Sequence, residues 1–118
     1  MAILQQIDAP ACRNLTTALE FLGKRWNGAI LVALSRGADR FSLVLRGVPG
    51  LSDRMLAARL KELEQYGVVA RTVIPTTPVQ IRYQLTAHGV RVLRALEPLV
   101  SVGALMNDDE LRTGDGER

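Results

Sequence analysis

The sequence predicts one mostly α-helical domain that carries a single two-stranded antiparallel hairpin. Its length of 118 residues leaves room for one domain with short tails. Apolar residues recur at helical spacing through most of the chain. Residues 68–85 differ, because two alternating β-branched segments there flank a turn with two prolines. We therefore expect an arm at residues 1–11, a folded domain at residues 12–106 and a disordered acidic tail at residues 107–118.

Three helices are predicted in the first half of the chain. The first runs from Asn14, a favourable N-cap, to Gly23, and its apolar residues recur at helical spacing: Leu15, Leu19 and Leu22. The second, at residues 26–36, is almost entirely apolar and is expected to lie at the centre of the domain. The third, at residues 40–47, is short because a glycine and a proline follow it.

The fourth helix is the clearest element of the sequence. Ser52 is expected to cap its start and Gly67 to end it. Leu56, Leu60 and Leu63 fall on one side of this helix and predict its buried face. The opposite side is made of small, polar and basic residues, namely Arg54, Ala57, Ala58, Lys61 and Gln65.

A hairpin and a last helix complete the chain. The segments VVARTVI and VQIRYQL are predicted strands, and the intervening PTTP is their turn. Thr86 is expected to cap the last helix, whose apolar face holds Val90, Leu93 and Leu96. The third and fourth helices are joined by the tight sequence GVPGLS, which is typical of a helix-turn-helix. A hairpin directly after such a pair predicts a winged helix-turn-helix.

Charge is unevenly distributed along the chain. The net charge is +3, but the last twelve residues hold five acids and two bases, so the rest carries 13 bases and 7 acids. A basic body with an acidic tail points to a polyanionic partner. Thirteen of the 15 basic residues are arginine, which suits bidentate contacts with phosphate or guanine, although GC-rich coding would also enrich arginine.

Several classes of protein are not expected. One cysteine cannot form an internal disulfide, which excludes a secreted disulfide scaffold. Neither a signal peptide nor an apolar run of about 18 residues is present, so we expect a cytoplasmic protein without membrane contact. His88 has no partner ligand in the pattern, so we expect no metal, no cofactor and no enzyme activity.

The chain resembles the HxlR-type bacterial winged-helix transcription regulators, which are MarR-like. The resemblance spans about residues 12–99 and depends on several short motifs in order. They are Cys12, the Gly-Lys-Arg-Trp block at 23–26, Arg40-Phe41, Gly50-Leu51-Ser52, Leu60-Lys61-Glu62-Leu63-Glu64, Tyr66-Gly67, and Tyr83-Gln84-Leu85-Thr86 with Gly89. The resemblance implies a homodimer built through the first and last helices and a palindromic double-stranded operator read by the helix from Ser52.

The predicted winged helix-turn-helix indicates which residues are candidates for DNA binding. Major-groove contact requires a slim, polar helix start, which Ser52, Arg54, Ala57, Ala58 and Lys61 provide. Arg54 is the candidate for a bidentate base contact, whereas Lys61 is placed for phosphate. Phosphate contacts that position the protein are expected from the third helix and the hairpin, namely from Arg40, Arg46, Thr76, Thr77, Gln80 and Arg82.

Cys12 is the candidate sensor residue. It is expected just before the first helix and beside Arg13, and both a helix N-terminus and a neighbouring cation favour the reactive thiolate. The resemblance implies a response to oxidants, quinones or other electrophiles through this thiol. The family cysteine is usually followed by proline, and here Arg13 takes that place. The alternative for Cys12 is a small apolar residue buried at the dimer seam.

The expected function is therefore a transcription repressor that senses oxidants or electrophiles through Cys12. Two alternatives stay open. One is a winged-helix regulator whose signal is a small molecule bound at the dimer interface, with an inert Cys12. The other is a winged helix used for protein–protein contact, with an incidental basic face.

Overall fold

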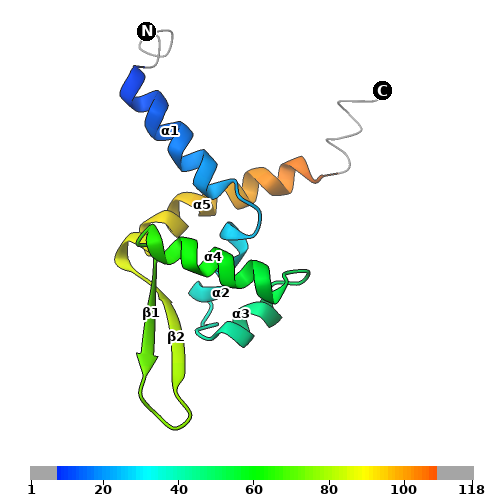
Figure 1. The fold of residues 1–118 in the computed structure, drawn as a ribbon. Coiled ribbons are helices and arrows are strands. Elements are labelled where there is room, and N and C mark those ends of the chain that lie inside the picture. Colours follow the sequence, from blue (N-terminus) through cyan, green and yellow to red (C-terminus); the bar gives the residue numbers. More distant parts are fainter. Residues whose placement is uncertain (1–7, 109–118) are drawn as a thin grey trace.

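The computed structural model describes residues 8–108 as five helices and one two-stranded antiparallel sheet (Figure 1). The helix-turn-helix of α3 and α4 is followed directly by the hairpin, so the predicted winged helix-turn-helix is confirmed. The elements are α1 (Ala9–Leu22), α2 (Asn27–Ser35), α3 (Phe41–Gly47), α4 (Asp53–Gln65), β1 (Val69–Ile74), β2 (Gln80–Leu85) and α5 (Ala87–Met106).

The hydrophobic core lies between the end of α1, α2, α3, α4 and the base of the hairpin, and the first half of α5 packs against it. The predicted faces of α2 and α4 supply six of the twelve described residues that are buried in this core. Trp26 and Phe41 are partly buried and pack against this core. The side chains with the least exposure are Ile30, Leu31, Val44, Leu56, Leu60, Leu63, Val68 and Val69.

The fourth helix begins and ends as its sequence predicts. The Oγ of Ser52 accepts a hydrogen bond from the backbone N–H of Met55 at 3.1 Å, which satisfies one of the free donors of the first turn. Gly67 follows the helix with a φ of +77°, a left-handed conformation that favours glycine. This pair of signals fixes the position of α4 along the chain.

The hairpin, or wing, pairs Val69 with Leu85 at its base and Ile74 with Gln80 near its tip. Tyr83 and Leu85 of β2 pack against the core, so the base of the wing is anchored. The backbone N–H of Tyr83 also donates to the carbonyl of Asp39 at 2.8 Å, which ties the wing to the α2–α3 connection.

The start of α5 is held tightly to the end of α4. Thr86 caps α5 by accepting a hydrogen bond from the N–H of Gly89 at 3.0 Å, and it donates to the carbonyl of Gly67 at 2.6 Å. A Cβ at position 89 would lie 2.0 Å from the carbonyl oxygen of Val68. Only glycine therefore permits this approach.

Two boundaries differ from the prediction. The first helix starts at Ala9 rather than near Asn14, because Asp8 acts as its N-cap and its carboxylate accepts from the N–H of Ala11 at 2.7 Å. Pro10 fits in the first turn of a helix, where a missing N–H costs nothing. Trp26 lies outside α2 as its N-cap, with a φ of +83°.

The helix α1 and the second half of α5 extend away from the core, on the side opposite the wing tip (Figure 1). Residues 9–20 are all exposed, including Leu15 at 53% and Leu19 at 57%. Apolar side chains at the end of α5 are exposed as well, namely Leu99, Val100, Val102, Leu105 and Met106.

Candidate nucleic-acid interface

The exposed face of α4 carries the residues predicted to enter the major groove. Arg54, Ala57, Ala58 and Lys61 are all exposed. Arg54 forms no ion pair within residues 8–108, so its guanidinium is available to a ligand. Ser52 is exposed too, but its hydroxyl already caps the helix. The two alanines leave the middle of this face slim.

The residues of α3 and the wing that are predicted to contact phosphate lie in separate places. Arg40 lies at the start of α3 and its Nη2 donates to Oε1 of Gln80 at 3.5 Å, which brings α3 and the wing together. Thr76 and Thr77 lie apart from them, exposed at the hairpin tip. Arg46 is exposed in the last turn of α3.

Arg82 is less free than its position on the wing predicts. Its Nε lies 3.9 Å from Oδ2 of Asp39, and both side chains are about two-fifths exposed. The carboxylate therefore compensates part of the positive charge of this arginine. Sequence reasoning could not find the pair, because 43 positions separate the two residues and the hydrogen bond of Tyr83 brings them together.

Four basic residues near α4 were missed. Arg71 on β1 lines a hollow together with Ala57 and Lys61, on the wing side of α4. On the other side of α4, Lys24 and Arg25 line a second hollow with Arg59. The Gly-Lys-Arg-Trp block, which was given no DNA-binding role, is the signal that could have found Lys24 and Arg25, but it does not contain Arg59 or Arg71.

Two residues that line the second hollow, Lys24 and Arg59, form a cluster of ion pairs with Glu62. Lys24 Nζ lies 2.5 Å from Oε2 of Glu62, and Arg59 Nη1 lies 2.8 Å from Oε1. The hydrogen bond from Lys24 is the main cause that lowers the pKa of Glu62 below its ordinary value, and the charges of Lys24 and Arg59 act in the same direction. Partial burial opposes the shift.

Cys12 lies inside the first helix rather than before it. Its N–H donates to the carbonyl of Asp8 at 3.0 Å, and its thiol is exposed. The alternative for Cys12, burial at a dimer seam, concerns the homodimer and stays a prediction. His88 is exposed and its Nδ1 lies 3.3 Å from Nη2 of Arg91.

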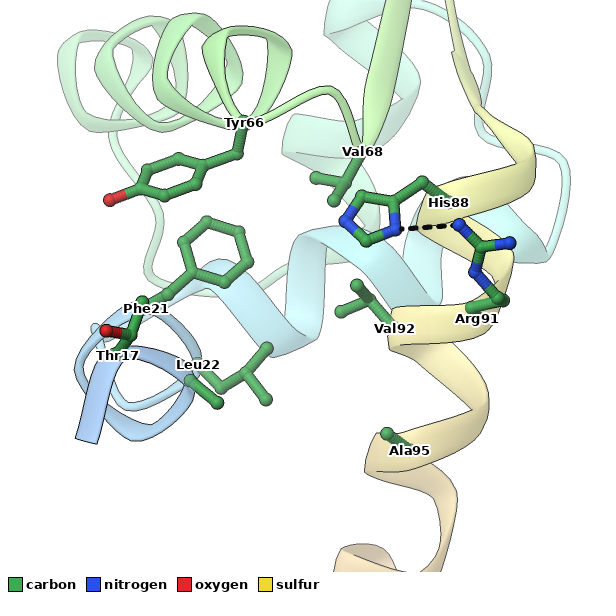
Figure 2. Close-up of a pocket in the computed structure, with 10 residues that line it drawn as sticks. Thr17, Phe21, Leu22, Tyr66, Val68, His88, Arg91, Val92 and Ala95 are labelled. Atoms are coloured by element: carbon green, nitrogen blue, oxygen red, sulfur yellow. Dashed lines mark hydrogen bonds between the residues drawn. The ribbon is translucent and has the colours of Figure 1, made fainter. Parts of the chain in front are cut away.

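An apolar cavity of about 370 Å³ lies between α1, the end of α4 and α5. Figure 2 shows the rings of Phe21 and Tyr66 on one side and Val92 and His88 on the other. The two rings pack with their centroids 4.4 Å apart. Most of the lining is apolar, and polar groups stand at its rim: the hydroxyls of Thr17 and Tyr66, and the side chains of His88 and Arg91.

Within residues 8–108, no three side chains of histidine, cysteine, aspartate or glutamate gather closely enough to hold a metal ion. In the same part of the chain, none of the helices has both the length and the hydropathy that spanning a bilayer requires.

Comparison with known proteins gives consistent matches. The model of the HxlR-like helix-turn-helix family matches residues 21–110. The HTH-type transcriptional regulator YodB of Bacillus subtilis is 47% identical over 78 residues, which is 66% of this chain and 70% of YodB. The structure of reduced YodB matches with a TM-score of 0.73 and 35% identity, covering 87% of this chain and 97% of that chain.

Two treated forms of YodB are also similar to this chain. The diamide-treated form has a TM-score of 0.69 at 37% identity and covers 82% of this chain and 92% of its own. The quinone-bound form has a TM-score of 0.67 at 35% identity and covers 79% of this chain and 98% of its own. Cys12 precedes the residues that the family model matches.

Proposed function

Because the chain belongs to the HxlR-like helix-turn-helix family, we propose that it is a sequence-specific repressor that binds double-stranded DNA as a homodimer. The observation that carries this proposal is the exposed face of α4. It combines a free arginine, Arg54, with the small residues Ala57 and Ala58, next to a wing that flanks it. A slim helix with an unpaired arginine can enter the major groove and contact a guanine edge.

Contacts with the backbone would come from the elements around α4. Lys61, Arg40 and Arg46 supply positive charge, and Thr77 at the hairpin tip supplies a hydroxyl donor. The hydroxyl of Thr76 already donates to the carbonyl of Pro78 at 2.8 Å. Such contacts fix the orientation of the protein on DNA without reading sequence, so they add affinity for all duplexes alike. The other residues proposed to contact the backbone are Thr76, Thr77, Gln80 and Arg82. Ser52 supports these contacts by capping the start of α4.

The homodimer is supported by the uncovered apolar faces of α1 and α5. Leu15 and Leu19 on α1, and Leu99 and Leu105 on α5, are each more than half exposed in the single chain. A face of this kind is stabilised by burial against a second copy. Two copies would place their α4 helices in successive major grooves, with half-sites about one helical turn apart.

A direct test compares Arg54→Ala with Arg46→Ala on two duplexes. One duplex is selected by the wild-type protein from a random library, and the other has random sequence. Arg54→Ala should lose about 1–3 kcal/mol of discrimination between them, whereas Arg46→Ala should weaken both alike. Fluorescence anisotropy at several salt concentrations measures the affinity of each variant for each duplex. Equal losses on the two duplexes for Arg54→Ala would contradict the base contact.

We further propose that Cys12 switches DNA binding in response to oxidants or electrophiles. Its thiol is exposed near the start of a helix whose apolar face is expected at the dimer seam. The similarity to YodB, which has been solved in diamide-treated and quinone-bound forms, supports this chemistry. Diamide would oxidise two Cys12 thiols to one intersubunit disulfide, taking up two electrons and two protons. A quinone would instead form a thioether adduct with one thiolate.

The thiol switch is tested by diamide treatment of wild-type protein and of Cys12→Ser. Treatment should change the affinity of wild type for its selected duplex and leave the affinity of Cys12→Ser unchanged. Mass spectrometry confirms that Cys12 is modified. An unaltered affinity with full modification would rule the switch out.

The cavity of Figure 2 favours a second candidate function, in which the signal is a small, mostly apolar molecule and Cys12 is inert. The cavity lies between α1 and α5, so its occupation would act on the helices that the dimer is expected to use. Ala95→Trp would fill it. In this case Cys12→Ser keeps its response to the inducer in a transcription reporter, and Ala95→Trp loses it.

A further inference from the structure

A second positively charged surface lies beside α4, formed by Lys24, Arg25 and Trp26 of the α1–α2 connection together with Arg59. We propose that this surface, here called the loop platform, binds the DNA phosphate backbone on the edge of α4 opposite the wing. The proposal rests on the proposed function and adds to it a contact surface that the motif-based candidates did not include.

The position of the loop platform follows from the two edges of α4. Successive residues turn by about 100°, so Met55, Arg59 and Glu62 share one edge, while Ala57, Lys61 and Glu64 share the other. The first edge shares a hollow with the α1–α2 connection. The second shares a hollow with the wing, lined by Arg71 and Tyr83 among others. The exposed face of α4 therefore runs between two flanking surfaces.

The positive charge of the loop platform is only partly compensated. One carboxylate, that of Glu62, pairs with both Lys24 and Arg59, so this group of three keeps a net positive charge. Arg25 has no carboxylate within 4 Å among residues 8–108, and its guanidinium lies 4.6 Å from the centroid of the Trp26 ring. Three cations thus face one anion.

Stacking on Trp26 also limits where the guanidinium of Arg25 can lie. A cation held against a tryptophan face keeps its N–H donors in a defined plane, and planar N–H groups match phosphate oxygens. Trp26 is itself anchored, because it packs against the core. The loop platform therefore presents the guanidinium of Arg25 in a defined orientation.

The dimensions of DNA place phosphates on both edges of an inserted helix. The major groove is about 12 Å wide, and a helix with its side chains is about 10–12 Å across. Such a helix fills the groove and lies close to both bordering strands. Arg40 and Arg71 are placed for the strand on the wing side, and Arg25 and Lys24 for the other strand.

The test is the affinity of Arg25→Ala for a random duplex of about 30 base pairs, measured by anisotropy across a potassium chloride series. Loss of one phosphate contact per protomer should weaken binding roughly three- to tenfold near 0.15 M salt and reduce the slope of log K against log salt by about 0.9 per contact. The matched control is Arg94→Ala, which removes the same charge from an exposed site on α5. Thermal unfolding confirms that both variants are folded.

A second variant gives a change of opposite sign. Glu62→Gln removes the carboxylate of the cluster without shortening the side chain, so the affinity for the same duplex should rise by a few-fold. Equal affinities and slopes for Arg25→Ala and Arg94→Ala would overturn the loop platform, and so would weaker binding by Glu62→Gln. Wild-type protein that binds no duplex in a salt-dependent manner would instead contradict the proposed function.

Discussion

Leucines recur at the same helical spacing on α4 and on α1, but those of α4 are buried and Leu15 and Leu19 of α1 are exposed. On α4, Leu56, Leu60 and Leu63 are buried to 2% exposure or less. On α1, Leu15 and Leu19 are more than half exposed. The first face is covered by α2, α3 and the hairpin, whereas the second extends beyond them (Figure 1).

Helical periodicity of apolar residues therefore identifies an apolar face but does not show which part of the structure covers it. The part from α2 to the first half of α5, together with Phe21 and Leu22 at the end of α1, buries its apolar side chains in one core. Residues 9–20 of α1 and the second half of α5 lack that cover within the chain, and exposed apolar patches of this kind mark interaction surfaces. Stability should therefore depend on protein concentration in the second region and not in the first.

The largest effect that tests this comparison is expected from Leu56→Ala. Removing a fully buried leucine leaves a cavity, so the free energy of unfolding should fall by about 2–5 kcal/mol at every protein concentration. Leu19→Ala should act only through association, so its effect should vanish on dilution. Urea unfolding at several protein concentrations measures both. A concentration-independent loss for Leu19→Ala would contradict the division of the chain.

The two glycines of α5 provide the next largest contrast. Gly89→Ala places a Cβ 2.0 Å from the carbonyl oxygen of Val68, and the resulting strain should cost about 1–3 kcal/mol. Gly103→Ala meets no atom within 4 Å and should stabilise the helix by roughly 0.5–1 kcal/mol. Thermal unfolding compares them. Destabilisation by Gly103→Ala would place this position against a partner copy.

A smaller contrast involves two of the three helices in residues 8–108 whose first turn is capped by a side chain, α4 and α1. Ser52→Ala removes the cap of α4, whose packing is part of the core, and should cost about 1 kcal/mol of unfolding free energy. Asp8→Ala removes the cap of the projecting α1. It should reduce the helical circular dichroism signal while shifting the urea midpoint less than Ser52→Ala does. The reverse order would show that α1 is integral to the cooperative unit.

Local signals in the sequence predicted most of the fold. Ser52, Thr86 and Gly67 mark helix ends by chemistry that acts over a few residues, and the structure confirms all three. The start of α1 was wrong, since both Asp8 and Asn14 can cap a helix and the sequence does not rank them. The conformation of Trp26 was also missed, because a positive φ is rare outside glycine.

The candidate site was less predictable than the fold. The exposed face of α4 follows from helical periodicity alone. The pairs of Arg82 with Asp39 and of Lys24 with Glu62 join distant parts of the chain, so only the packed structure brings them together. Whether a basic residue is free for DNA or already paired depends on such contacts.

The smallest expected effect concerns the ion pairs of Glu62 with Lys24 and Arg59. It tests whether these pairs stabilise the folded core. The pKa of Glu62 is lowered in the folded state, mainly by the hydrogen bond from Lys24. Its stabilising contribution is therefore fully present above the ordinary carboxyl pKa of 4.5 and is lost as the pH falls through the lower folded value.

Glu62→Gln should therefore flatten the decline of the unfolding free energy in this acidic range. Glu64→Gln on the same helix, an exposed site without an ion pair in residues 8–108, is the control and should follow wild type. Because the cluster is partly exposed, added salt should reduce the difference between wild type and Glu62→Gln. Parallel stability curves for wild type and Glu62→Gln between pH 3 and 6 would mean that the cluster adds no measurable stability to the fold.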